Sequence, residues 1–256
     1  MRSPLKDKNG FECIDAIHAL LPGESSVKTF LFFSGNLELA LKHYGHQVTA
    51  YTNKYVTFEF WKCAARNPIN IIQKAEWLHK KLDLELIYTF QENWPMYKDP
   101  FVRSALFMLL NIYSNKGGIS SGHFSMENYN PIVINKLKNL YNIDKKINII
   151  YHHDESYLDC FDNLEIKDEE ILIIPVGKFS HNWLQHGTHR GFEDYMVNHK
   201  ELKQKLEEKG CKFILCYRPH RSLYDFYSGY NMRLVNKYGT ETKKLENCHD
   251  VLIYNF

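Results

Sequence analysis

The sequence predicts an α/β fold: a doubly wound, mixed and mostly parallel sheet with helices on both faces. Short apolar segments rich in β-branched and aromatic residues alternate with segments whose apolar residues recur at helical spacing. A strand at residues 29–33 and a helix from Leu37 precede a second strand at 46–52 and a helix at 55–67. Such a strand–helix–strand unit favours parallel strands. With 256 residues, 44% of them hydrophobic, the chain is long enough to form one such domain.

An inserted subdomain of helices and one loop is predicted roughly between residues 68 and 145. Its helices are expected at residues 70–84, 99–114 and 131–143. Asp99 followed by Pro100 is typical of a helix N-terminus. The stretch 115–131 is rich in Gly, Ser and Asn, so we expect an exposed loop or hairpin there, more mobile than the flanking helices.

The last third of the chain continues the alternation of strands and helices. Strands are expected at residues 147–154, 170–176, 211–217 and 250–256. Helices are expected at residues 198–210 and 222–230. Together with the first two strands, these segments predict a mixed sheet of the seven-stranded type that ends in a hairpin closed by residues 250–256.

The charge of the chain excludes a polybasic nucleic-acid-binding protein. The net charge is only +2, from 32 basic and 30 acidic residues, so nucleic acid could be contacted only through a local patch. Basic residues outnumber acidic ones at residues 110–150 and again at 217–244. A solvated surface is the alternative interpretation of both stretches.

No segment of the sequence is typical of export or of a membrane span. The N-terminal MRSPLKDKNG is polar, and no apolar run approaches the roughly 20 residues that a membrane helix needs. The six cysteines form no CxxC pair, which favours free thiols in a reducing compartment. The 17 Tyr and 16 Phe, with frequent Asn, Lys and Ile, are typical of an AT-rich genome. We therefore expect a cytoplasmic or virion protein that is not secreted.

Short motifs at both ends of this pattern point to a family. FFSGNLELAL forms the first strand–turn–helix, and LEEKGCKFILCYRPHRSLYDFY and ENCHDVLIYNF form the last third. In these motifs and in element order, residues 30–256 resemble the Dam family of DNA adenine-N6 methyltransferases. The resemblance implies a Rossmann-like methyltransferase fold, S-adenosylmethionine as cofactor, and cofactor contacts from Phe33, Gly35 and Asn36. An ordinary strand–helix turn is the alternative interpretation of these three residues.

The family has two acidic cofactor positions, which correspond to Thr52 and Asp154. The first is an acid that accepts hydrogen bonds from both ribose hydroxyls. Neither Thr52 nor Asn53 can supply a charged bidentate acceptor there. The second is an acid near the adenine of the cofactor, and Asp154 stands at its place. The alternative interpretation of Asp154 is an ordinary acid in the loop after a strand. The cofactor site is therefore predicted to be vestigial: no cofactor is expected, and S-adenosylmethionine binds only if the site is competent.

The catalytic strand of the family ends in Asp-Pro-Pro-Tyr. The Asp and a Pro carbonyl accept hydrogen bonds from the amino group of the flipped adenine, and the Tyr stacks on its ring. This sequence has Ile174, Pro175, Val176 and Gly177 instead, so the acid and the aromatic are both missing. Phe179 could stack on a base but carries no charge. The predicted catalytic site is accordingly degenerate.

The inserted loop of the family enters DNA. The loop NIYSNKGGISSGHF has the corresponding place and turn character, and its polar side chains are suited to phosphate or base edges. In the second basic stretch two arginines follow a strand end. The candidate nucleic-acid residues are Asn115, Lys116, Ser121, His123, Arg218 and Arg221. A loop that faces solvent or a protein partner is the alternative for the first four.

A metal site is a weaker alternative. The spacing of His181, His186 and His189, near Glu193 and Asp194, could supply zinc ligands, although loop histidines without a helical frame are usually solvated.

Three functions follow from these patterns. The first is an inactive methyltransferase-like protein that acts as a structural or binding module, with protein partners in a viral or phage assembly. The second is a DNA-binding protein that retains the family's DNA groove. The third is an active S-adenosylmethionine-dependent DNA adenine methyltransferase with a rewired site.

Overall fold

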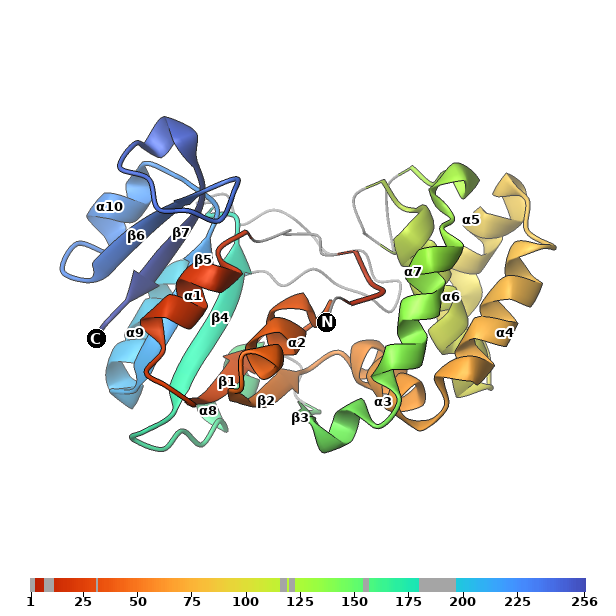
Figure 1. The fold of residues 1–256 in the computed structure, drawn as a ribbon, viewed down its shortest axis with the longest axis horizontal. Coiled ribbons are helices and arrows are strands. Elements are labelled where there is room, and N and C mark those ends of the chain that lie inside the picture. Colours follow the sequence, from red (N-terminus) through yellow and green to blue (C-terminus); the bar gives the residue numbers. More distant parts are fainter. Residues whose placement is uncertain are drawn as a thin grey trace.

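Seven strands form one sheet in the part of the chain that the computed structural model describes, namely residues 3–6, 12–30, 32–115, 119, 123–153, 157–179 and 197–256. The strands are β1 Ser26–Phe30, β2 Gln47–Thr52, β3 Ile147–Tyr151, β4 Ile171–Gly177, β5 Lys212–Tyr217, β6 Asn231–Asn236 and β7 Cys248–Tyr254. Their order across the sheet is β3-β2-β1-β4-β5-β7-β6 (Figure 1). Strands β1 to β5 are parallel, and β7 runs antiparallel to β5 and β6. The predicted α/β class with a mixed, mostly parallel sheet is confirmed.

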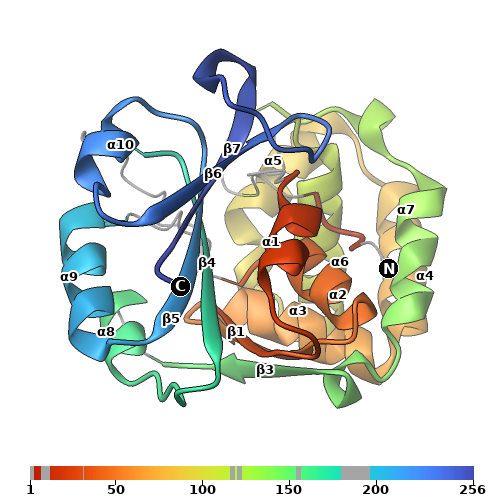
Figure 2. The same cartoon turned by 60° about the vertical axis from the view of Figure 1, so that its left-hand side comes forward.

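Helices cover both faces of this sheet (Figure 2). One face carries α1 Ile14–Leu20, α2 Asn36–His43 and α3 Tyr55–Arg66, and the other carries α8 Tyr157–Asp162, α9 His199–Lys209 and α10 Ser222–Phe226. The cause is visible in β4, where side chains alternate between the faces. Ile171 and Ile173 belong to the core beneath α1–α3, whereas Leu172 and Ile174 belong to the core beneath α8–α10. A strand that is apolar on both faces needs cover on both.

Four further helices lie between α3 and β3 in the chain. They are α4 Pro68–His79, α5 Leu84–Asn93, α6 Pro100–Tyr113 and α7 Pro131–Asn135. They gather beside the sheet, with the almost fully buried α6 packed against α3 and α4 (Figure 1). Short 3-10 turns occur at Trp94–Met96, Met126–Asn128, Lys136–Leu140, Ile143–Lys145 and Leu245–Asn247.

Two predicted helices of this insertion have wrong boundaries. The helix expected at 70–84 ends at His79, and α5 then begins, because the Asp83 side chain accepts a hydrogen bond from the Leu86 amide at 2.8 Å and caps a new helix. The helix expected at 131–143 is α-helical only to Asn135 and continues as the 3-10 turn. None of the helices in the described ranges combines the length and apolar character that crossing a bilayer requires.

Asp99 illustrates how the insertion is held together. Its Oδ1 atom accepts a hydrogen bond from the Phe101 amide at 2.8 Å and so caps α6. Its Oδ2 atom lies 2.8 Å from the Lys74 ammonium of α4. The hydrogen bond from Lys74 holds the pKa of this carboxyl below its ordinary value.

We expect Asp99→Ala to lower the free energy of unfolding by about 1 kcal/mol, because the cap is lost. Asp99→Asn should cost less, since the amide oxygen still caps the helix. A lowered folded-state pKa means that the contribution of the charge is complete above the unfolded pKa and is lost as the pH falls through the folded pKa. Urea unfolding at neutral and at successively lower pH should therefore show the wild type and Asp99→Asn converging in acid. A difference that grows in acid would contradict this sign.

Candidate functional site

The sheet order reverses between β1 and β4, and in open α/β sheets ligands bind beyond the carboxyl ends of the strands at such a point. The turn after β1 lies here. Gly35 adopts a left-handed conformation with φ of 72° and precedes α2, which begins at Asn36. The Asn36 side chain accepts a hydrogen bond from the Ser3 amide at 3.0 Å, so it holds the N-terminal segment of the chain.

The open side of Gly35 is filled by the indole ring of Trp61 from α3. A Cβ atom added at Gly35 would lie 2.4 Å from Trp61 Cζ2, far inside contact distance. The Trp61 Nε1 atom donates a hydrogen bond to the Phe33 carbonyl at 3.1 Å, which fixes the ring against the turn. The resemblance assigns the close approach at this glycine to a cofactor, and in the structure that approach is made by a buried side chain.

Thr52 is buried at the end of β2, and its side chain forms a hydrogen bond with the backbone two residues further on. Its Oγ1 atom accepts a hydrogen bond from the Lys54 amide at 3.1 Å, just before α3 begins. The next side chain, Asn53, has a buried Oδ1 atom without a hydrogen-bond partner among the described residues. The end of β2 thus carries no carboxylate at Thr52 or Asn53, where the resemblance expects an acid that binds the ribose. Asp154 lies outside the described residues.

The end of β4 has a backbone that departs from a regular strand. Ile174 is 1% exposed and packs into the core beneath α8–α10, so its side chain does not face a ligand site. The pairing with β5 is irregular between Ile174 and Gly177, with Pro175 and Val176 half-buried between them. Gly177 has φ of 88°, a conformation that an aromatic residue adopts only with strain. The backbone thus favours glycine at residue 177, where the resemblance expects the stacking aromatic.

Phe179 lies beyond this bend but is no free stacking platform. It is 5% exposed, and its ring centroid lies 4.6 Å from that of His199 and 5.4 Å from that of Phe226. Tyr217 packs on the same ring at 5.9 Å and joins a buried chain of hydrogen bonds, 3.0 Å to His199 Nδ1 and 2.9 Å to the Tyr227 hydroxyl. The expectation that Phe179 could stack on a base is therefore wrong, because the protein's own aromatic side chains pack against its ring.

The two ends of the insertion loop pair with each other in the described residues, and one residue between them is buried. Ser114 and Phe124 form an antiparallel bridge, and the Asn115 amide donates to the His123 carbonyl at 3.2 Å. The side chains of Asn115 and His123 are exposed, as expected for a hairpin. Ile119 is buried, and its carbonyl accepts a hydrogen bond from Gln91 Nε2 at 3.1 Å. The other two candidates of this loop, Lys116 and Ser121, lie outside the described residues.

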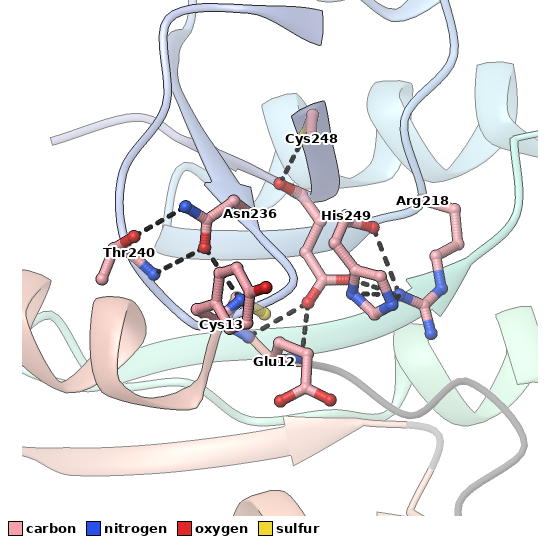
Figure 3. Close-up of polar contacts among 9 residues, drawn as sticks. Glu12, Cys13, Arg218, Asn236, Thr240, Cys248 and His249 are labelled. Atoms are coloured by element: carbon pink, nitrogen blue, oxygen red, sulfur yellow. Dashed lines mark hydrogen bonds and ion pairs between the residues drawn. The ribbon is translucent and has the colours of Figure 1, made fainter. Parts of the chain in front are cut away.

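Arg218, expected to contact nucleic acid, is held instead by a buried carboxylate at the start of β7. Asp250 is fully buried, and its Oδ1 atom lies 2.6 Å from Arg218 Nη1. Its Oδ2 atom accepts hydrogen bonds from the amides of Glu12 at 2.5 Å and Cys13 at 3.0 Å, where α1 begins (Figure 3). The same Nη1 atom of Arg218 also contacts the ring and the carbonyl of His249 (Figure 3). No sequence motif pointed to this role of Asp250.

Arg221 lies only three residues further along, yet in a different environment. It is exposed at the rim of a groove between the β5–α10 connection and the β6–β7 connection. The opposite side of the groove carries Lys244 and Glu246. The structure thus brings together two distant parts of the basic stretch at 217–244, while Arg218 is withdrawn into its ion pair.

The described residues contain no group of three His, Cys, Asp or Glu side chains placed to hold a metal ion. The candidate metal site at His181, His186 and His189 lies outside the described residues. No family model and no curated protein sequence matches the chain.

Proposed function

We propose that this protein is a catalytically inactive DNA adenine methyltransferase-like protein that serves as a structural or binding module in a viral or phage assembly. The end of β4 carries the proposal. Ile174, at the place of the catalytic acid, is packed into the core, and Gly177, at the place of the stacking aromatic, has a left-handed backbone. A single substitution could not restore the site, because two side chains differ from the family motif and an aromatic residue at Gly177 would be strained.

The chemistry of adenine methylation supports this proposal. The exocyclic amino nitrogen of adenine is a poor nucleophile, and groups that accept hydrogen bonds from it must be placed for the transition state. Each lost charge-assisted hydrogen bond costs about 1.5–3 kcal/mol. This chain lacks the acid at Ile174 and the ribose acid at Thr52. The first loss affects the adenine and the second affects the cofactor, so we expect little binding of either substrate and less catalysis.

The sheet, by contrast, is complete. All five parallel strands and the antiparallel hairpin are present, with two continuous cores on its faces. The glycine turn after β1 also persists, but it accommodates Trp61. A scaffold that keeps its packing without its reactive groups is suited to presenting surfaces to partners.

Purified protein incubated with labelled S-adenosylmethionine and adenine-containing single- or double-stranded DNA should transfer no methyl group above a no-enzyme blank. An active adenine methyltransferase run in parallel validates the assay, and calorimetry with S-adenosylmethionine should show no binding heat. Circular dichroism must confirm that the protein is folded. Methyl transfer that disappears in Pro175→Ala would overturn the proposal and favour a rewired active enzyme.

The assembly role has its own test. Protein purified at native abundance from its source should elute from a sizing column with other proteins, at a mass above that of the single chain, 30.4 kDa. Elution as a free monomer, with methyl transfer also absent, would contradict the structural role without restoring the enzymatic one.

A second candidate function is nucleic-acid binding without methylation. The observation that favours it is the groove with Arg221 and Lys244 on its two sides.

A further inference from the structure

A groove of 920 Å³ lies between two connections at the C-terminal side of the sheet. One wall is the β5–α10 connection with Pro219, His220 and Arg221, and the other is the β6–β7 connection with Lys244 and Glu246. Its volume is at the upper end of the range of about 300–1,000 Å³ typical of ligand pockets. The groove is therefore large enough for a nucleotide unit.

The cations of this groove are available to a ligand. Arg221 is exposed, and within the described ranges its guanidinium makes no hydrogen bond or ion pair. Lys244 Nζ lies 3.9 Å from Glu246 Oε1, and both side chains are more than 70% exposed, at 72% and 74%. Such an exposed pair at the distance limit holds neither partner firmly. A phosphate between the two walls would meet one guanidinium and one ammonium.

An aromatic side chain, Tyr224, does not line the groove itself but neighbours Cys248, which does. Tyr224 follows Arg221 by one helical turn on α10 and is 42% exposed. Partial burial and the neighbouring Cys248 thiol, which lines the groove, raise the pKa of Tyr224. Proteins that bind single-stranded nucleic acids combine exposed aromatic rings, on which the bases stack, with basic residues that contact the phosphates.

We infer that this groove binds the phosphate backbone of single-stranded nucleic acid, with Arg221 and Lys244 on the phosphates and Tyr224 beneath a base. The inference deepens the proposed function, because it names a partner for a protein that does no chemistry on it. A duplex is a poorer fit, since its bases are stacked on each other and not offered to the Tyr224 ring. With a net charge of only +2, binding depends on this local site and not on the overall charge.

The test measures fluorescence anisotropy of a labelled oligothymidine at several salt concentrations. The wild type should bind, and Arg221→Glu/Lys244→Glu should weaken binding at least about tenfold and reduce the salt slope by about 1.4, since each single-strand phosphate contact contributes about 0.7. Tyr224→Ala should weaken binding about fivefold or more through the loss of stacking. Glu246→Gln, which removes the acid of the groove, should strengthen binding.

Matched controls locate the effect. Lys80→Glu/Lys138→Glu changes the net charge by the same amount at exposed lysines of the insertion, and Tyr141→Ala removes an exposed tyrosine there. Both should bind like the wild type. An equal loss in these controls, or no binding by the wild type, would overturn the inference. So would equal competition by inorganic phosphate, which would indicate a small-anion site, or tighter binding of duplex than of single strand. The methyl-transfer assay remains independent of every one of these outcomes.

Discussion

Asp250→Ala should lower the free energy of unfolding by about 3–5 kcal/mol, the range expected when one partner of a buried ion pair is removed. Asp250 is fully buried and satisfies the amides of Glu12 and Cys13 together with the guanidinium of Arg218. Alanine would leave two amides without an acceptor and the partly buried Arg218 without its counter-charge. Urea or thermal unfolding followed by circular dichroism measures the loss.

Two comparisons make this result specific to the buried carboxylate. Glu241 lies in the neighbouring β6–β7 connection, is 66% exposed, and has its Oε2 atom 3.6 Å from Nε of Arg233. Glu241→Ala should therefore lower the free energy of unfolding by no more than about 1 kcal/mol. Arg218→Ala combined with Asp250→Ala should cost less than the sum of the two single changes, since they share one interaction. Equal losses at Asp250 and Glu241 would show that burial of this carboxylate contributes nothing.

Gly35→Ala should destabilise the protein by about 2–5 kcal/mol. Its φ of 72° costs an L-residue about 1–2 kcal/mol, and overpacking against a fixed ring typically costs about 1–3 kcal/mol more. The added Cβ would lie 2.4 Å from Trp61, whose indole is tied to the Phe33 carbonyl and cannot withdraw freely. The same unfolding experiment measures this change.

Gly210 offers the matched control for Gly35. It has a similar φ of 62° at the end of α9, but a Cβ added there meets nothing within 4 Å. Gly210→Ala should therefore show only the conformational cost of about 1–2 kcal/mol. If the two alanine variants lose the same stability, Trp61 does not occupy the turn as described.

The strands of the parallel sheet could be predicted because each is a short apolar run between turn residues, as in residues 171–174 of β4. The elements that sequence reasoning missed are less distinctive. α1 has seven residues, and β6 lies at the sheet edge with mostly half-buried side chains. The break between α4 and α5 was missed because Asp83 reads as part of one charged helical surface until its cap is seen.

The residue types at the candidate site can be read from the sequence, but the packing around them cannot. The sequence has Ile174 and Gly177 where the resemblance expects an acid and an aromatic residue. The filling of the Gly35 turn by Trp61 depends on packing between a turn and a distant helix, which no local pattern reports. The same holds for Arg218, whose partner Asp250 lies 32 residues along the chain. The available signal was Asp250 itself, a single acid directly before the apolar run 251–253.

The place of β7 between β5 and β6 has a consequence for biosynthesis. β7 leaves the ribosome after every other strand of this sheet, yet it supplies the partner for β5 and the acceptor for the amides that begin α1. A nascent chain that has completed β6 still has an unpaired apolar edge on β5, the kind of edge that invites wrong partners. The edge of β5 and the amides that begin α1 therefore gain these partners only after β7 has been translated.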